Sequence, residues 1–147
     1  MNVERLKPLQ DLAESREQDA AERFARHKQA LEAQEQRLSD LQNYQADYRN
    51  QMSGAMSPSL LRNRQDFMSR LNDAVRQQGE QVAKARQAYE LERQRWVDAR
   101  GETQVLDKLE QNYQAQAAQR GLRREQFELD ELAARLHRQA REQESST

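Results

Sequence analysis

The sequence contains no cysteine, two prolines and four glycines. Without cysteine it cannot form a disulfide or use a thiolate as nucleophile or metal ligand. Because Gly and Pro are so scarce, few tight turns are available, and this argues against folds with many strands. Apolar residues are also few, at 35% of the chain, and the mean hydropathy is −1.25. That is too little apolar material for a thick core, and no apolar run approaches the length of a transmembrane helix.

The chain also has no excess of either positive or negative charge. The 24 basic and 25 acidic residues are closely mixed and leave a net charge of −1, so the chain has no overall field to attract nucleic acid or anionic lipid. Charges occur throughout the first residues, up to Gln18, and this argues against a signal peptide. We therefore expect a protein that is made and kept in the cytosol.

The residues that dominate are Ala, Gln, Glu, Arg and Leu, which are good helix formers. Apolar residues recur every three or four positions along the chain, and this spacing favours long helices that share a narrow apolar seam. Disorder is the competing interpretation, and it is opposed by this sustained period and by the near-zero net charge. It is more plausible for the tail from Glu142 to Thr147 than for the body of the chain.

One short break interrupts the helical pattern, at Ser53–Pro58. Gly54 suits the C′ position of a helix that ends near Met52, Ser57 suits an N-cap, and Pro58 suits the first position of the next helix. The sequence therefore predicts an all-α fold in which two long helices form an antiparallel coiled-coil hairpin, with the longer C-terminal helix overhanging. The whole chain, 1–147, is predicted to be this single hairpin, with helices over about 3–52 and 58–143 and a turn over 53–58.

Heptads define the seam on both arms. The first arm has Phe24 at position a, and its other seam positions are Leu31, Leu38, Gln45 and Met52 at a, and Ala13, Ala20, His27, Gln34, Leu41 and Tyr48 at d. The second arm has Leu61 at a, followed by Met68, Val75, Val82, Tyr89, Trp96 and Thr103 at a, and Leu71, Gln78, Ala85, Ala99, Leu106 and Tyr113 at d. A single seam histidine, His27, is better explained by packing than by metal binding, and no metal site is predicted.

The two arms differ in length, at roughly 75 Å and 130 Å for 1.5 Å per residue. In an antiparallel hairpin Val3 would lie near Leu109, and the chain beyond that point would have no partner helix. An apolar stripe nevertheless continues there: Leu122, Phe127, Leu129, Leu132 and Leu136. This stripe is either a frayed end or a docking surface, and docking is the favoured interpretation.

A second candidate surface lies near the break. Pairs of residues whose numbers sum to 115 should lie at the same level of the hairpin, and this brings six residues together: Leu41, Tyr44, Tyr48, Phe67, Leu71 and Ala74. Tyr44 and Phe67 lie just off the seam, where large rings are common contact residues. Hairpin core and partner surface are equally good interpretations of this group.

Motifs of enzyme chemistry are absent: the sequence has no Gly-rich phosphate loop, no HExxH and no cysteine nucleophile. A two-helix hairpin also offers no enclosed pocket, so we expect neither an enzyme nor a cofactor. Arg120, Arg123 and Arg124 form a small basic cluster, but acidic residues follow at once, as is usual for a solvated helix face. Nucleic-acid binding is therefore not expected.

Two stretches carry a family resemblance. Residues 96–110, WVDARGETQVLDKLE, and residues 124–133, REQFELDELA, resemble the flagellar FliJ family, and the resemblance covers essentially the whole chain. It implies a component of the flagellar type III export apparatus, with an antiparallel coiled coil similar to the gamma stalk of rotary ATP synthases. The implied partners are the export ATPase FliI, its regulator FliH, the export gate FlhA and export chaperones, with membrane association only through them.

The resemblance also implies roles for the two surfaces. The positions that contact FlhA in the family match Leu41, Tyr44, Tyr48, Phe67, Leu71 and Ala74, whereas Arg37 and Gln78 depart from the family pattern. The analogy with the gamma stalk would place the end with the termini, including the apolar residues from Leu122 to Leu136, in the ATPase ring. Two alternatives stay open: the equivalent stalk of a virulence injectisome, and a generic structural coiled coil that forms a homodimer through the unpaired end of its longer helix.

Overall fold

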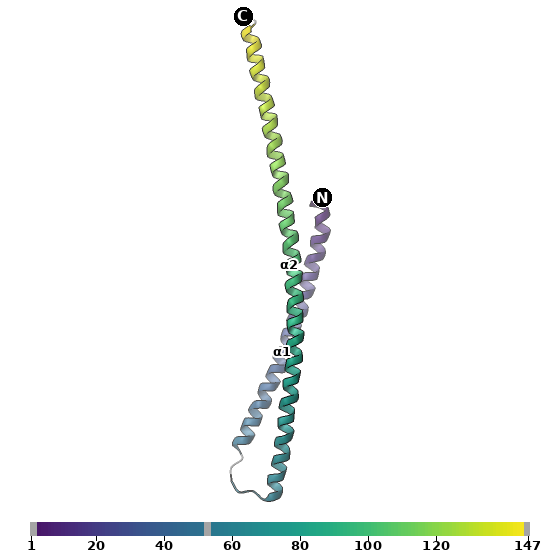
Figure 1. Cartoon of the computed structure of the whole chain (residues 1–147), viewed down its shortest axis with the longest axis vertical. Coiled ribbons are helices and arrows are strands. Elements are labelled where there is room, and N and C mark those ends of the chain that lie inside the picture. Colours follow the sequence, from purple (N-terminus) through teal and green to yellow (C-terminus); the bar gives the residue numbers. More distant parts are fainter. Residues whose placement is uncertain (1–2, 52–53, 146–147) are drawn as a thin grey trace. The chain divides into compact units, whose positions relative to one another are not determined.

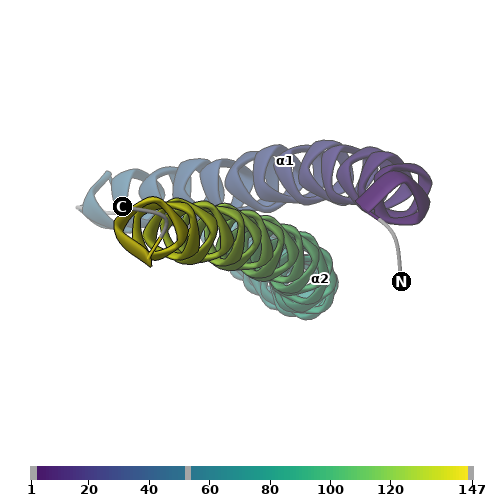
Figure 2. The same ribbon diagram turned by 90° about the horizontal axis from the view of Figure 1, so that it is seen from above.

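The computed structural model describes residues 3–51 and 54–145, and these form two long helices. Helix α1 is Val3–Asn50 and helix α2 is Pro58–Ser145. Both are continuous coiled ribbons in two perpendicular views (Figures 1 and 2), and no strand occurs among the described residues. The predicted all-α fold class is confirmed.

The connection between the helices follows the predicted turn chemistry in part. Pro58 is the first residue of α2, and the backbone N–H of Leu60 donates to Ser57 Oγ at 3.3 Å, so Ser57 is the N-cap. Gly54 has φ of +112°, in the region that favours glycine. However, α1 ends at Asn50, so Gly54 belongs to the loop and the predicted C′ role is wrong. Met52 and Ser53, which the sequence placed at the helix end, lie outside the described residues.

The chain divides into two units, which we describe separately. The hairpin unit comprises residues 14–101 and contains the connection between the helices. The terminal unit comprises residues 1–13 and 102–147, of which 3–13 and 102–145 are described.

Within the hairpin unit, α1 and α2 are antiparallel and share the predicted seam. Ala20, Leu31, Leu71 and Val82 are buried, and the other predicted seam residues of this unit are half-buried, with two exceptions. One is Met52, which is not described. The other is Leu61, which is 44% exposed, so its predicted seam position is wrong. The residue at its level in the hairpin falls after the end of α1, and no helix is present there to cover it.

Polar pairs fix the alignment of the two helices in the hairpin unit. The side-chain amide of Gln78 donates to the backbone oxygen of Gln34 at 3.0 Å and to its side-chain oxygen at 2.7 Å. Closer to the loop, Gln45 donates to Asn72. Farther from it, Arg86 pairs with Glu35 at 3.0 Å. The Gln78–Gln34 pair is half-buried at the seam, and a polar pair there is satisfied in only one alignment, so it specifies the register; the other two pairs are exposed and contribute less.

Within the terminal unit, a short stretch of α1 lies against α2. Leu6 is 1% exposed and Ala13 is 6% exposed, and the side-chain amide of Gln10 donates to the carboxylate of Glu110. On α2, burial continues as far as Tyr113, which is half-buried. The paired stretch therefore reaches about one helical turn beyond Leu109, where the sequence placed its end.

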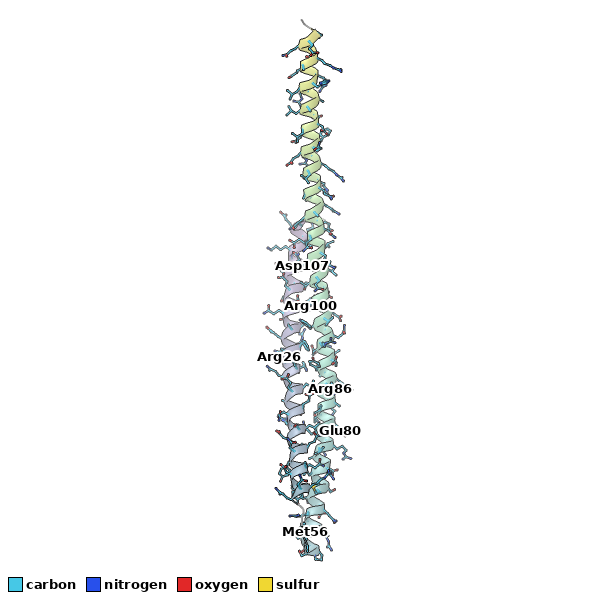
Figure 3. All side chains as sticks on the ribbon, turned by 90° about the vertical axis from the view of Figure 1, so that its left-hand side faces the viewer. Arg26, Met56, Glu80, Arg86, Arg100 and Asp107 are labelled. Atoms are coloured by element: carbon cyan, nitrogen blue, oxygen red, sulfur yellow. The ribbon has the colours of Figure 1, made fainter. Side chains whose placement is uncertain are left out.

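Among the described residues of this unit, no second helix lies against the remainder of α2. Every residue from Gln114 to Ser145 is exposed, a length of about 48 Å at 1.5 Å per residue. We call this stretch the overhang. In Figure 3 its side chains project from the yellow end of α2 with no second helix beside it. The predicted overhang of the longer helix is confirmed.

Candidate docking surfaces

The first candidate surface is an aromatic group in the hairpin unit, close to the loop. The rings of Tyr48 and Phe67 lie 4.7 Å apart between centroids, and those of Tyr44 and Phe67 lie 6.2 Å apart in an edge-on arrangement. The guanidinium of Arg64 lies 5.9 Å from the centre of the Tyr48 ring, which is a cation–π contact. The cross-helix grouping predicted from residue numbers that sum to 115 is confirmed for these rings.

The members of this group differ sharply in exposure. Leu71 is 6% exposed and belongs to the core of the hairpin, whereas Tyr44 is 53% exposed and Phe67 is 37% exposed. The other three, Leu41, Tyr48 and Ala74, are half-buried. The core interpretation is confirmed for Leu71, whereas Tyr44 and Phe67 are accessible to a partner. We call the six residues together the aromatic patch; its role in binding a partner stays a prediction.

The second candidate surface is on the overhang. Its apolar residues are half or more exposed: Leu122 65%, Phe127 62%, Leu129 61%, Leu132 50% and Leu136 57%. At 100° per residue the four leucines fall within an arc of about 80°, but Phe127 stands about 180° from its centre. The predicted single stripe of five is therefore wrong in one member, because the spacing of Phe127 places it on the opposite face. We call the four leucines the leucine stripe.

Charge divides the overhang into blocks. Arg123 and Arg124 are followed by four acidic residues within 125–131, and these by three arginines within 135–141. Glu125 and Glu128 flank a shallow hollow with Leu129 and Leu132, so acidic groups border the leucine stripe directly. Exposed charges of this kind are solvated, and they change the stability of the chain little by themselves. They affect binding according to the charge of the residues that a partner places opposite them.

A second aromatic cluster lies in the middle of the hairpin unit. Phe24 contacts Tyr89 and Trp96 with centroid distances of 5.2 and 5.5 Å, and Arg100 lies over the Trp96 ring at 5.5 Å. All three rings are half-buried seam residues on facing helices. They fill the space between the helices, so this cluster stabilises the hairpin and is not a candidate docking surface.

Two buried residues were missed from the sequence: Leu6, which lies seven residues before Ala13 and is 1% exposed, and Glu92. Glu92 occupies a d position of α2 and is 6% exposed. Its carboxylate pairs with Arg95 at 2.9 Å and lies 3.8 Å from Arg23, and its Oε2 has no hydrogen-bond partner. The signal was present, since counting seven residues on from Ala85 gives Glu92, but a charged residue at such a position is rarely buried.

Two further features bear on the class of site. In the described ranges no three His, Asp or Glu side chains come together in a way that could hold a metal ion. Neither α1 nor α2, over the residues described, contains a stretch both long and apolar enough to cross a membrane.

The fold and its two exposed surfaces define a class: an all-α helical-hairpin protein that exposes apolar side chains at two distinct places. The family model for the flagellar FliJ protein matches residues 1–142. The chain is 28% identical over 134 residues to the flagellar FliJ proteins of Escherichia coli K12 and of Salmonella typhi, covering 88% of this chain and 91% of each relative. It belongs to the flagellar FliJ family and is thus a component of the flagellar export apparatus.

Proposed function

We propose that this chain is a non-enzymatic stalk that associates with the export ATPase ring, promotes its assembly and activity, and links it to the export gate FlhA. The observation that carries the proposal is the overhang. From Gln114 to Ser145 the described chain is helical and every residue is exposed, although several of these residues carry large apolar side chains. Apolar groups exposed in this way are typical of a surface that a partner covers.

The distribution of these side chains favours a partner that surrounds the helix. The leucine stripe lies on one face of the overhang and Phe127 on the opposite face, and both are well exposed. A partner on one side could cover only one of these faces. A ring of subunits with the helix in its central opening could contact both.

The aromatic patch is the proposed contact with the export gate. Leu71 anchors the patch in the hairpin core, while Tyr44 and Phe67 present rings to solvent. Aromatic side chains that are held in place by neighbours and left exposed lose little conformational entropy on binding, and they dominate many interfaces. Arg37 is exposed and free to contribute at the edge, whereas Gln78 is already bonded to Gln34 and is not proposed as a contact.

The remaining parts of the proposal rest on the family resemblance. The chain would act at the cytoplasmic face of the inner membrane and be held there through its partners, which would include the ATPase regulator FliH. It would also bind export chaperones and serve as a general export chaperone. These roles need accessible helix faces, and exposed polar faces run along both helices.

The test is ATP hydrolysis by the export ATPase with and without this chain. We expect the full chain to raise the rate, deletion of residues 125–147 to abolish the increase, and Phe127→Ala to reduce it. Gln119→Ala, an exposed polar position on the same overhang, is the matched control and should stimulate as the full chain does. An unchanged rate with the full chain would refute the proposed role at the ring. Full stimulation by the deletion variant would refute the role of the overhang.

A further inference from the structure

The leucine stripe follows a heptad of its own, and this allows its possible partners to be compared. Leu122, Leu129 and Leu136 are spaced by seven and take position a; Leu132 takes position d, and so does Glu125. All are exposed in the terminal unit. A seam of this kind is completed by a second amphipathic helix of matching length, so a second copy of the same overhang is a candidate occupant.

Charge decides the orientation that such a pair would take. In a parallel pair Glu125 would lie in the seam beside Glu125 of the second copy, and the two carboxylates would repel each other. In an antiparallel pair with Leu129 opposite Leu132 of the second copy, Glu125 lies at the level of Leu136. The antiparallel arrangement therefore avoids the like-charge contact and stacks leucines at its centre.

Charge also decides the register. Position g, which flanks the seam, is occupied by Glu128 and Arg135. With Leu129 opposite Leu132, each Glu128 faces Arg135 of the other copy, so the symmetric pair gains two ion pairs. Shifting one copy by a heptad toward the C-terminus would instead bring Arg135 against Arg135. The acidic block within 125–131 and the arginines within 135–141 thus complement each other in one antiparallel register.

We propose that in the free chain the leucine stripe pairs with the same stripe of a second copy, antiparallel, with Glu128 facing Arg135. The pairing is reversible, because the seam is short and its ion pairs are exposed to solvent. It leaves Phe127 uncovered. If the ATPase ring binds the overhang as proposed above, ring binding and self-pairing exclude each other; this consequence alone rests on the proposed function.

The first test measures self-association of the full chain by sedimentation velocity over a range of concentrations at low salt. Glu128→Arg and Arg135→Glu each replace two attractive pairs with two repulsive ones, and each should weaken association about tenfold, since exposed pairs contribute a few-fold each. An equimolar mixture of the two variants should recover it, because the arginine introduced in one variant then faces the glutamate introduced in the other. Phe127→Ala is the matched control and should associate as the unaltered chain does.

The second test establishes orientation by disulfide cross-linking, which the absence of native cysteine makes clean. Leu122→Cys mixed with Gln139→Cys should cross-link, since the two positions are opposite each other in the proposed register. Leu122→Cys alone should not, because its two copies would be about 25 Å apart along the axis. The proposal is overturned by a monomer at every concentration, by no recovery in the mixture, or by cross-linking of Leu122→Cys with itself.

The outcomes separate this proposal from the stalk function. Failure of self-pairing appears in sedimentation of the chain alone, with no ATPase present. Failure of the stalk function appears as unchanged ATP hydrolysis. Phe127→Ala should lower stimulation of the ATPase and leave self-association intact, so the two proposals can fail independently.

Discussion

Truncating the two exposed rings of the aromatic patch should separate binding from folding. Tyr44 is 53% exposed, so its replacement by alanine removes less buried area than truncation of a core residue would, whereas Phe67 is 37% exposed and loses more. Phe67 also contacts both Tyr44 and Tyr48, and each ring contact contributes about 0.5–1.5 kcal/mol. We therefore expect the double variant to unfold earlier than the unaltered chain but to keep its helicity under native conditions.

The effect on binding should be much larger. Central aromatic residues of an interface commonly contribute about 2 kcal/mol or more, which is about a thirtyfold loss of affinity. The assay is calorimetric titration of the cytoplasmic part of the export gate with each variant, alongside thermal unfolding followed by circular dichroism. Leu71→Ala is the contrasting variant: Leu71 is 6% exposed, and its truncation should cost about 2–4 kcal/mol of folding stability. An affinity unchanged by loss of both rings would refute the assignment of the patch.

Three further outcomes follow from the hairpin unit, each measured by denaturant unfolding of the full chain. Glu92→Leu should raise the free energy of unfolding by about 1–3 kcal/mol, because it replaces a buried carboxylate, one oxygen of which accepts no hydrogen bond, with an apolar seam residue. A loss of stability would contradict this. Ser57→Ala should lower it by about 1 kcal/mol through loss of the N-cap bond to Leu60, and no change would show that the cap is not formed. Replacing Gln34 and Gln78 together by leucine should not destabilise the chain but should let the helices shift register, seen as broadened NMR signals; sharp signals would argue against a register role.

Much of the fold could be predicted because one physical rule governs it. Apolar side chains spaced by three and four fall on one helix face, and this spacing placed Phe24, Leu31 and Tyr89 on the seam, as the structure confirms. Antiparallel geometry then predicted which levels of the two helices meet, and the contact of Tyr48 with Phe67 follows from it. In a two-helix hairpin the spacing of apolar residues along each helix nearly determines which residues contact each other between the helices.

The errors arose where that rule was applied too loosely. Phe127 was grouped with the leucines because it is apolar and near them in sequence, although its spacing places it on the opposite face. Glu92 was passed over because charged residues are rarely buried, yet two neighbouring arginines make its burial tolerable. Leu61 is exposed because α1 ends before it could cover that level, and the end of a helix is poorly specified by sequence.

The most direct test of the central claim is hydrogen exchange along the chain, measured by mass spectrometry with and without the export ATPase. Alone and dilute, amides from Gln114 to Ser145 should exchange much faster than those between Leu71 and Trp96, because an isolated helix is only marginally stable. Adding the ATPase should slow exchange throughout the overhang. Equal protection of both stretches in the chain alone, or an overhang whose exchange the ATPase leaves unchanged, would contradict the account.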